Sequence, residues 1–123
     1  MAAFERAGAF DSTGLTDQAV PLYRDALETG LEPGRRRRAI IQLASSLRAL
    51  GQAEESVQLL TAEREAGSDE LDDAVDAFLA LALVDTGRER EAASIALGAL
   101  APHLPRYQRS LANYARLITQ PER

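Results

Sequence analysis

The sequence contains no cysteine, no lysine and no tryptophan, and its single histidine is His103. Without cysteine the chain cannot form a disulfide framework, a thiolate zinc site or a cysteine nucleophile. One histidine also excludes any site that needs two imidazoles from the same chain. Aromatic residues make up only 5% of the 123 residues, so alanine and leucine must supply most of the packing.

Long hydrophobic runs are missing as well. No apolar run approaches the roughly 20 residues that a membrane-spanning helix needs. The first residues lack the pattern of a secretory signal peptide, so we expect a cytoplasmic protein that does not enter a membrane. All 14 basic residues are arginine, which is typical of codon bias in a GC-rich bacterial genome.

The net charge of -5 is unevenly distributed along the chain. Residues 1–51 carry a net charge of +1, residues 52–91 carry -9, and residues 92–123 carry +3. Binding to nucleic-acid phosphates needs a basic face. An acidic middle therefore argues against nucleic acid as a partner.

A short pattern recurs three times, at 13–20, 50–57 and 86–93. Its glycines, Gly14, Gly51 and Gly87, lie 37 and 36 residues apart. Apolar residues keep helical spacing before and after each glycine, and glycine is the residue that most often ends a helix in a left-handed turn. The pattern predicts a helical hairpin repeated three times.

Helix-breaking glycine and proline residues separate the hairpins, and a last helix follows the third hairpin. Ser68 is a natural N-cap for the helix that opens the third hairpin. Pro105 suits the first turn of an amphipathic helix over 105–119. We therefore expect an all-α chain of seven helices without strands, in one domain over 1–123. Its repeats lie at about 1–30, 35–67 and 69–101.

Small and bulky residues alternate at matching places in the three hairpins. The small residues of the first helices are Ala7, Ala44 and Ala80, and the bulky ones three residues later are Phe10, Leu47 and Leu83. Such pairs let two helices approach closely. With the turn glycines, they make nearly the whole chain resemble the tetratricopeptide repeat family. The surroundings of Leu22–Arg24 and Ser46–Arg48 are similar to a compact bacterial type with three repeats. The resemblance implies a right-handed α-solenoid closed by a capping helix.

Three departures from the family pattern stand out. No repeat has the early tryptophan, Ala96 is small where a large aromatic residue is usual, and Glu63 replaces a small buried residue. An unpaired buried carboxylate would cost several kcal/mol. Glu63 must therefore face solvent or pair with an arginine of the neighbouring repeat, and its polar sequence neighbours favour solvent.

Residues that could carry chemistry are few. His103 sits between two prolines and is expected to be an ordinary loop residue. The acidic set at 69–76 (Asp69, Glu70, Asp72, Asp73 and Asp76) lacks the calcium-loop pattern and indicates a solvated helix start. No phosphate-binding glycine motif or nucleophile elbow occurs. We expect no enzyme activity, no catalytic residue, no metal and no cofactor.

The family resemblance places a concave groove along the first helix of each hairpin. Its expected lining is Phe4, Arg38, Gln42, Ser45, Arg48, Phe78, Leu81 and Asp85. Phe78 and Leu81, together with Val84, form an apolar wall beside the polar wall of the second hairpin. Either the helix over 105–119 covers the apolar wall, or a partner's peptide does. Arg38 and Arg48 could grip a carboxylate, although the run 35–38 could equally be a solvated helix start.

These observations predict a module that binds another protein or a peptide segment in the concave groove. Two alternatives remain open. The chain could be a self-association module that forms a homodimer through its terminal helices or its alanine-rich second helices. It could also be a regulatory domain of a larger bacterial protein.

Overall fold

The structure is a computed structural model that describes residues 3–12 and 16–120, except for the side chains of 8–12. Within this part the chain forms seven α-helices and no strand. The helices are α1 (Ala3–Ser12), α2 (Thr16–Thr29), α3 (Pro33–Ala49), α4 (Ala53–Ala66), α5 (Asp72–Asp85), α6 (Glu89–Leu100) and α7 (Gln108–Leu117), with the short 3₁₀ helix η1 (Ala101–His103) after α6. Gly14 and the side chain of Phe10 lie outside the described residues. The all-helical prediction is confirmed.

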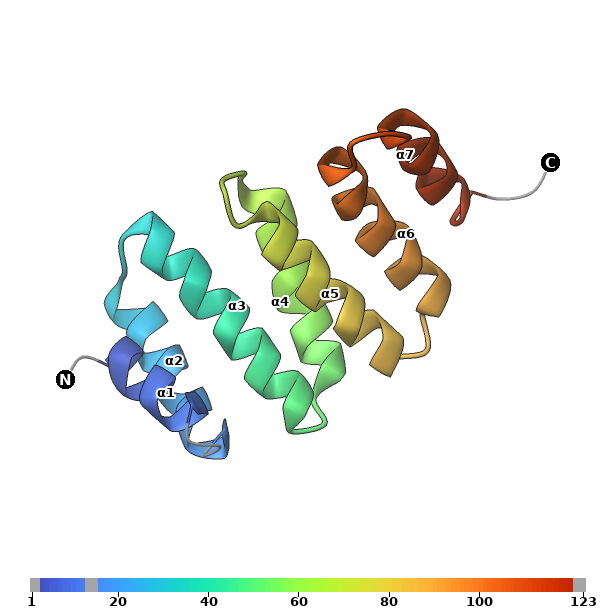
Figure 1. Ribbon diagram of the computed structural model, residues 1–123. Helices are drawn as coiled ribbons and strands as arrows, with labels where there is room; N and C mark the ends of the chain where they lie inside the picture. The colour runs from blue at the N-terminus through green and yellow to red at the C-terminus, as the bar shows by residue number, and fades with distance from the viewer. Residues whose placement is uncertain (1–2, 13–15, 121–123) are drawn as a thin grey trace.

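The helices stack in chain order as three antiparallel hairpins (Figure 1). Each helix packs on the next one along the chain, and the first helices also contact one another, α1 with α3 and α3 with α5. The first helices therefore form a continuous row on one face of the stack. The handedness of the solenoid stays a prediction.

Glycine ends the first helix of the second and third hairpins. Gly51 and Gly87 have φ of +85° and +80°, a conformation that side chains disfavour. After Gly51, the N–H of Gln52 donates to Leu47 O at 2.8 Å, and the N–H of Gly51 donates to Arg48 O at 3.0 Å. This pair of bonds is a Schellman motif. The turn predicted from the glycine spacing is confirmed at both positions.

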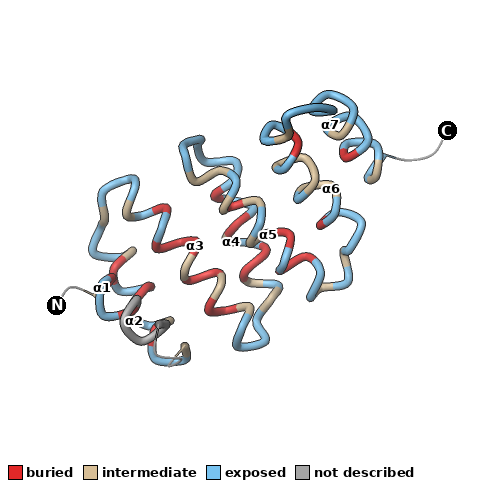
Figure 2. The backbone as a smooth tube through the Cα atoms, in the orientation of Figure 1, coloured by how far each residue is buried: buried red, intermediate tan, exposed pale blue. Residues whose placement is uncertain are grey.

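The core consists of two clusters that meet at α3 and α4 (Figure 2). The first contains Phe4, Ala7, Ala19, Tyr23, Ala26, Ala39, Leu43 and Leu47. The second contains Ile41, Ala44, Val57, Leu60, Val75, Leu79, Ala80, Ala82, Leu83 and Ala92. The small and bulky pairs expected at Ala44 with Leu47 and at Ala80 with Leu83 are all buried.

Two helices begin later than the sequence predicts. α5 begins at Asp72 rather than directly after Ser68, because the hydroxyl of Ser68 donates to Asp72 Oδ2 at 2.5 Å and holds a turn ahead of the helix. α7 begins at Gln108 rather than Pro105. Tyr107 precedes it with a φ of +69°, so the chain bends sharply before this helix can start.

Candidate functional site

The row of first helices contains a hollow of about 430 Å³. We call it the α3–α5 hollow; it is lined by Thr16, Ile41, Gln42, Ser45, Ser46, Ala49 and Phe78. Three residues predicted for the concave groove, Gln42, Ser45 and Phe78, therefore come together around one space. Gln42 and Ser45 project from α3, whereas Phe78 projects from α5 and packs against the second core cluster.

The α3–α5 hollow combines an apolar wall with an unsatisfied polar atom. Ile41, Ala49 and Phe78 supply the apolar surface. The side-chain oxygen of Gln42, Oε1, is buried and has no hydrogen-bond partner among the described residues. A buried acceptor without a partner costs free energy. A ligand in the hollow would recover that cost only if the Gln42 amide turned its oxygen toward the ligand's donor.

Arg48 and Asp85 join α3 to α5 beside this hollow. Arg48 Nη1 donates to Asp85 Oδ2 at 2.7 Å. Arg38 lies ten residues before Arg48 on the same helix, so their backbones are about 15 Å apart. The two arginines therefore do not lie close enough to grip one carboxylate, and Arg48 is already paired with Asp85.

Phe4 is a core residue and not part of the groove lining, which corrects the sequence prediction. It is buried in the first core cluster and meets the ring of Tyr23 edge-on, with the centroids 6.3 Å apart. Arg35 and Arg38 cover its remaining face, with guanidinium carbons 5.4 and 5.6 Å from the ring centroid. Phe4 is therefore held in the core by its contact with Tyr23, and the Arg38 guanidinium covers its ring.

Leu81 and Val84 lie outside the α3–α5 hollow. They line a second space of about 510 Å³ on the other side of α5, together with Ala77, Ala80, Glu89, Ala92, Ala93 and Ala96. We call this space the α5–α6 groove. Among the described residues, α7 packs against α6 and η1 and does not reach α5. The last helix therefore leaves this apolar wall open.

A buried ion cluster joins α3, α4 and the start of α5. Glu63 is buried rather than exposed, which corrects the prediction. Both of its carboxylate oxygens accept hydrogen bonds from Arg36 Nη1, at 3.3 and 3.1 Å. Arg37, itself buried, lies 3.9 Å from Glu63 Oε1, 3.3 Å from Asp69 Oδ1 and 2.8 Å from Asp72 Oδ1. The partners of Glu63 come from its own hairpin.

The same cluster explains part of the acidic set. Asp69 and Asp72 hold Arg37 and the turn before α5, so they are not merely a solvated helix start. The hydrogen bond from the Ser68 hydroxyl, the bond from the Asp69 backbone N–H and the charge of Arg37 lower the pKa of Asp72 below its usual value. Arg37 was missed, although the spacing 37, 40, 44, 47 places it on the buried stripe of α3.

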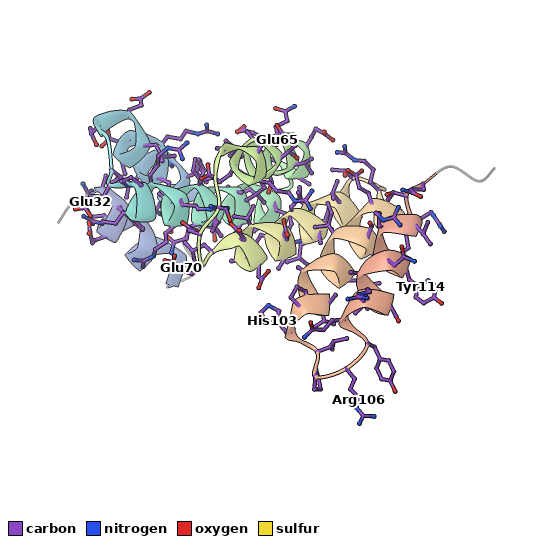
Figure 3. All side chains as sticks on the ribbon, turned by 90° about the horizontal axis from the view of Figure 1, so that it is seen from above. Glu32, Glu65, Glu70, His103, Arg106 and Tyr114 are labelled. Atoms are coloured by element: carbon purple, nitrogen blue, oxygen red, sulfur yellow. The ribbon has the colours of Figure 1, made fainter. Side chains whose placement is uncertain are left out.

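His103 lies in η1 at the end of α6 (Figure 3). Its Nε2 lies 2.5 Å from Asp73 Oδ2, and both side chains are exposed. Among the described residues no group of three or more histidine, aspartate or glutamate side chains could hold a metal ion. None of the described helices is both long enough and apolar enough to span a bilayer.

Comparison with known proteins identifies the repeat. The model of the family described as "Tetratrico peptide repeat" matches residues 1–118. Neither the comparison with curated proteins nor the comparison with solved structures gave a match. Repeats of this kind generally mediate protein–protein interactions and are typically non-catalytic. The family match agrees with the three hairpins, their turn glycines and the buried small residues, and the chain belongs to the tetratricopeptide repeat family.

Proposed function

We propose that this chain binds an extended segment of a partner protein in the α3–α5 hollow. The observation that carries the proposal is the meeting of Gln42, Ser45 and Phe78 around one space of about 430 Å³. This volume lies within the range of about 300–1,000 Å³ that is usual for ligand pockets. It suits one or two side chains of a peptide rather than a folded domain.

The lining favours a particular ligand chemistry. An apolar side chain would contact Ile41 and Phe78. A backbone N–H beside it would donate to Gln42 Oε1, a buried acceptor without a partner among the described residues, once the amide turns toward the hollow. Arg38 is exposed one helical turn before Gln42. A carboxylate of the bound segment would draw the Arg38 guanidinium away from the Phe4 ring and accept hydrogen bonds from it.

The fold keeps this surface rigid before the partner arrives. Arg48 and Asp85 tie α3 to α5, and Phe78 is held by the second core cluster. A receptor that is already ordered loses little conformational entropy on binding, so more of the contact energy appears as affinity. Rigid display of side chains is thus the mechanism that we assign to the groove.

Selection from a displayed library of random peptides tests the proposal without knowledge of the natural partner. The selected peptide is titrated by calorimetry into the wild-type chain, Gln42→Ala, Phe78→Ala and the control Gln58→Ala, which removes an exposed glutamine of α4. Loss of the hydrogen bond should weaken binding by about fivefold to tenfold for Gln42→Ala. Gln58→Ala should bind as the wild type does.

Phe78→Ala should weaken binding further, because it removes much of the apolar wall. Since Phe78 also packs against the core, the thermal midpoint of each variant is measured alongside. Selected peptides that bind all four proteins equally would refute the proposal and move the binding site to another surface.

A further inference from the structure

The α5–α6 groove occupies the place where the next first helix of a solenoid would pack. Adding 36 residues, the distance from Gly51 to Gly87, relates α3 to α5. Ile41 and Ala44 of α3 are buried in the core cluster shared with α5. Their counterparts on α5 are Ala77 and Ala80, which line the groove. The groove is therefore the empty equivalent of a filled helix–helix contact.

The uncovered face is more apolar than the covered one. Ser45 and Arg48 of α3 correspond to Leu81 and Val84 of α5, whose exposed fractions are 45% and 48%. A terminal repeat that faces only water is expected to have a polar outer surface. Five alanines surround these two residues in the groove, so a helix could approach α5 and α6 closely.

The outer side of α7 carries an apolar stripe that would fit such a groove. Tyr107, Tyr114 and Leu117 have exposed fractions of 73%, 67% and 44%. Tyr114 and Leu117 are three residues apart and share one side of α7, and Tyr107 lies just before the first residue of the helix. Tyr114 projects from α7 on the outer side of the molecule (Figure 3). Within its own chain α7 does not contact α5 in the described part.

Charge distinguishes two ways in which two copies could use these surfaces. Glu89 is the acidic residue that lines the groove, whereas Asp72, Asp76 and Asp85 of α5 already pair with arginines of α3 and α4. Pairing groove with groove would bring like charges together. Residues 92–120 contain three arginines, Arg106, Arg109 and Arg116, and no acidic residue. Pairing α7 with the groove therefore brings opposite charges together.

We propose that the α5–α6 groove binds α7 of a second copy of this chain. Tyr114 and Leu117 lie on Leu81 and Val84, and the arginines at the flank of α7 approach the edge of the groove that Glu89 lines. Because the two surfaces differ, the contact is heterologous. This proposal is independent of the peptide site, which lies on the other side of α5.

Sedimentation over a range of protein concentrations tests the association. The wild-type chain should show a mass that rises with concentration. Leu81→Ser in the groove and Tyr114→Ser on α7 should each raise the dissociation constant about tenfold or more, because each removes a large apolar contact. The control Leu50→Ser removes a similarly exposed leucine at the end of α3 and should leave the association unchanged.

Mixing the two variants decides which surfaces meet. Leu81→Ser retains α7, and Tyr114→Ser retains the groove. The mixture should therefore form a one-to-one complex at concentrations where each variant alone is mainly monomeric. A wild-type chain that is monomeric throughout would overturn the proposal. So would association that Tyr114→Ser leaves intact, which indicates groove-to-groove pairing, or a mixture that fails to form the complex.

Discussion

The second and third hairpins follow the same repeat, yet their second helices are anchored differently. α4 brings Leu60 and Glu63 into the interior, and both are buried. The counterparts on α6, 36 residues later, are Ala96 and Ala99, of which Ala96 is exposed and Ala99 half-buried. The large residue and the ion cluster fix α4 against α3. The small Ala96 leaves the groove beside α5 unfilled, so the repeat register alone does not set which side chains fill the space between two helices.

Among the variants that test how α4 and α6 are anchored, Arg37→Ala should lower the free energy of unfolding most. Arg37→Ala leaves the buried Glu63 with fewer cationic partners, and breaking a buried ion pair usually costs about 3–5 kcal/mol. We expect a fall of about 3 kcal/mol in the free energy of unfolding, measured with urea. Arg36 still contacts Glu63, which places the value at the lower end of that range.

The matched control lies in the third hairpin. Asp73 is the counterpart of Arg37, and its side chain is exposed beside His103 in the first turn of α5, so Asp73→Ala should change the unfolding free energy by no more than about 1 kcal/mol. Equal effects of Arg37→Ala and Asp73→Ala would show that the ion cluster does not anchor the second hairpin.

Substitutions in the first helices should cost similar free energies of unfolding in the second and third hairpins. Leu47 and Leu83 are equivalent and fully buried, so replacement of either by alanine should cost about 2–5 kcal/mol through the cavity left behind. Chemical denaturation measures both. A cost below about 1 kcal/mol for both variants would show that the repeat register is misassigned.

The turn glycines should also respond alike in the two hairpins. Gly51→Val and Gly87→Val force a branched side chain into positive φ, and we expect each to cost about 1–3 kcal/mol. Gly67 has a φ of 174° and an added Cβ would meet nothing within 4 Å, so Gly67→Val is the control and should be nearly neutral. Similar losses at all three positions would contradict the assignment of strain to the turns.

The smallest expected effect concerns acid stability and the turn before α5. The pKa of Asp72 is lowered in the folded chain, so its ionised form stabilises the fold above the usual pKa of an aspartate. That contribution is lost as the pH falls through the lowered pKa. Asp72→Asn should therefore reduce the dependence of the unfolding free energy on pH in the acid range. Asp25→Asn, at an exposed site in α2, should leave that dependence unchanged.

Three of the eight residues expected in the groove line one hollow, but the partners of the charged residues could not be predicted from the sequence. The family resemblance placed Gln42, Ser45 and Phe78 in one groove, and the α3–α5 hollow brings them together. Phe4 was placed in the groove on the same ground and is nevertheless buried, where Tyr23 from the next helix packs on its ring. Periodicity reports which side of a helix a residue occupies and not what a neighbouring helix places opposite it.

The sequence by itself determined the repeat. Turn glycines and small residues are required by the local backbone conformation and by close helix packing, and these requirements recur every 36 or 37 residues. Gly51, Gly87, Leu47 and Leu83 were assigned correctly on that ground alone. Only the tertiary structure decided that Glu63 is buried beside Arg36 and Arg37, and that α7 rests on α6 and leaves α5 open. Both outcomes depend on side chains that meet across helices, where distance and charge act between residues far apart in the chain.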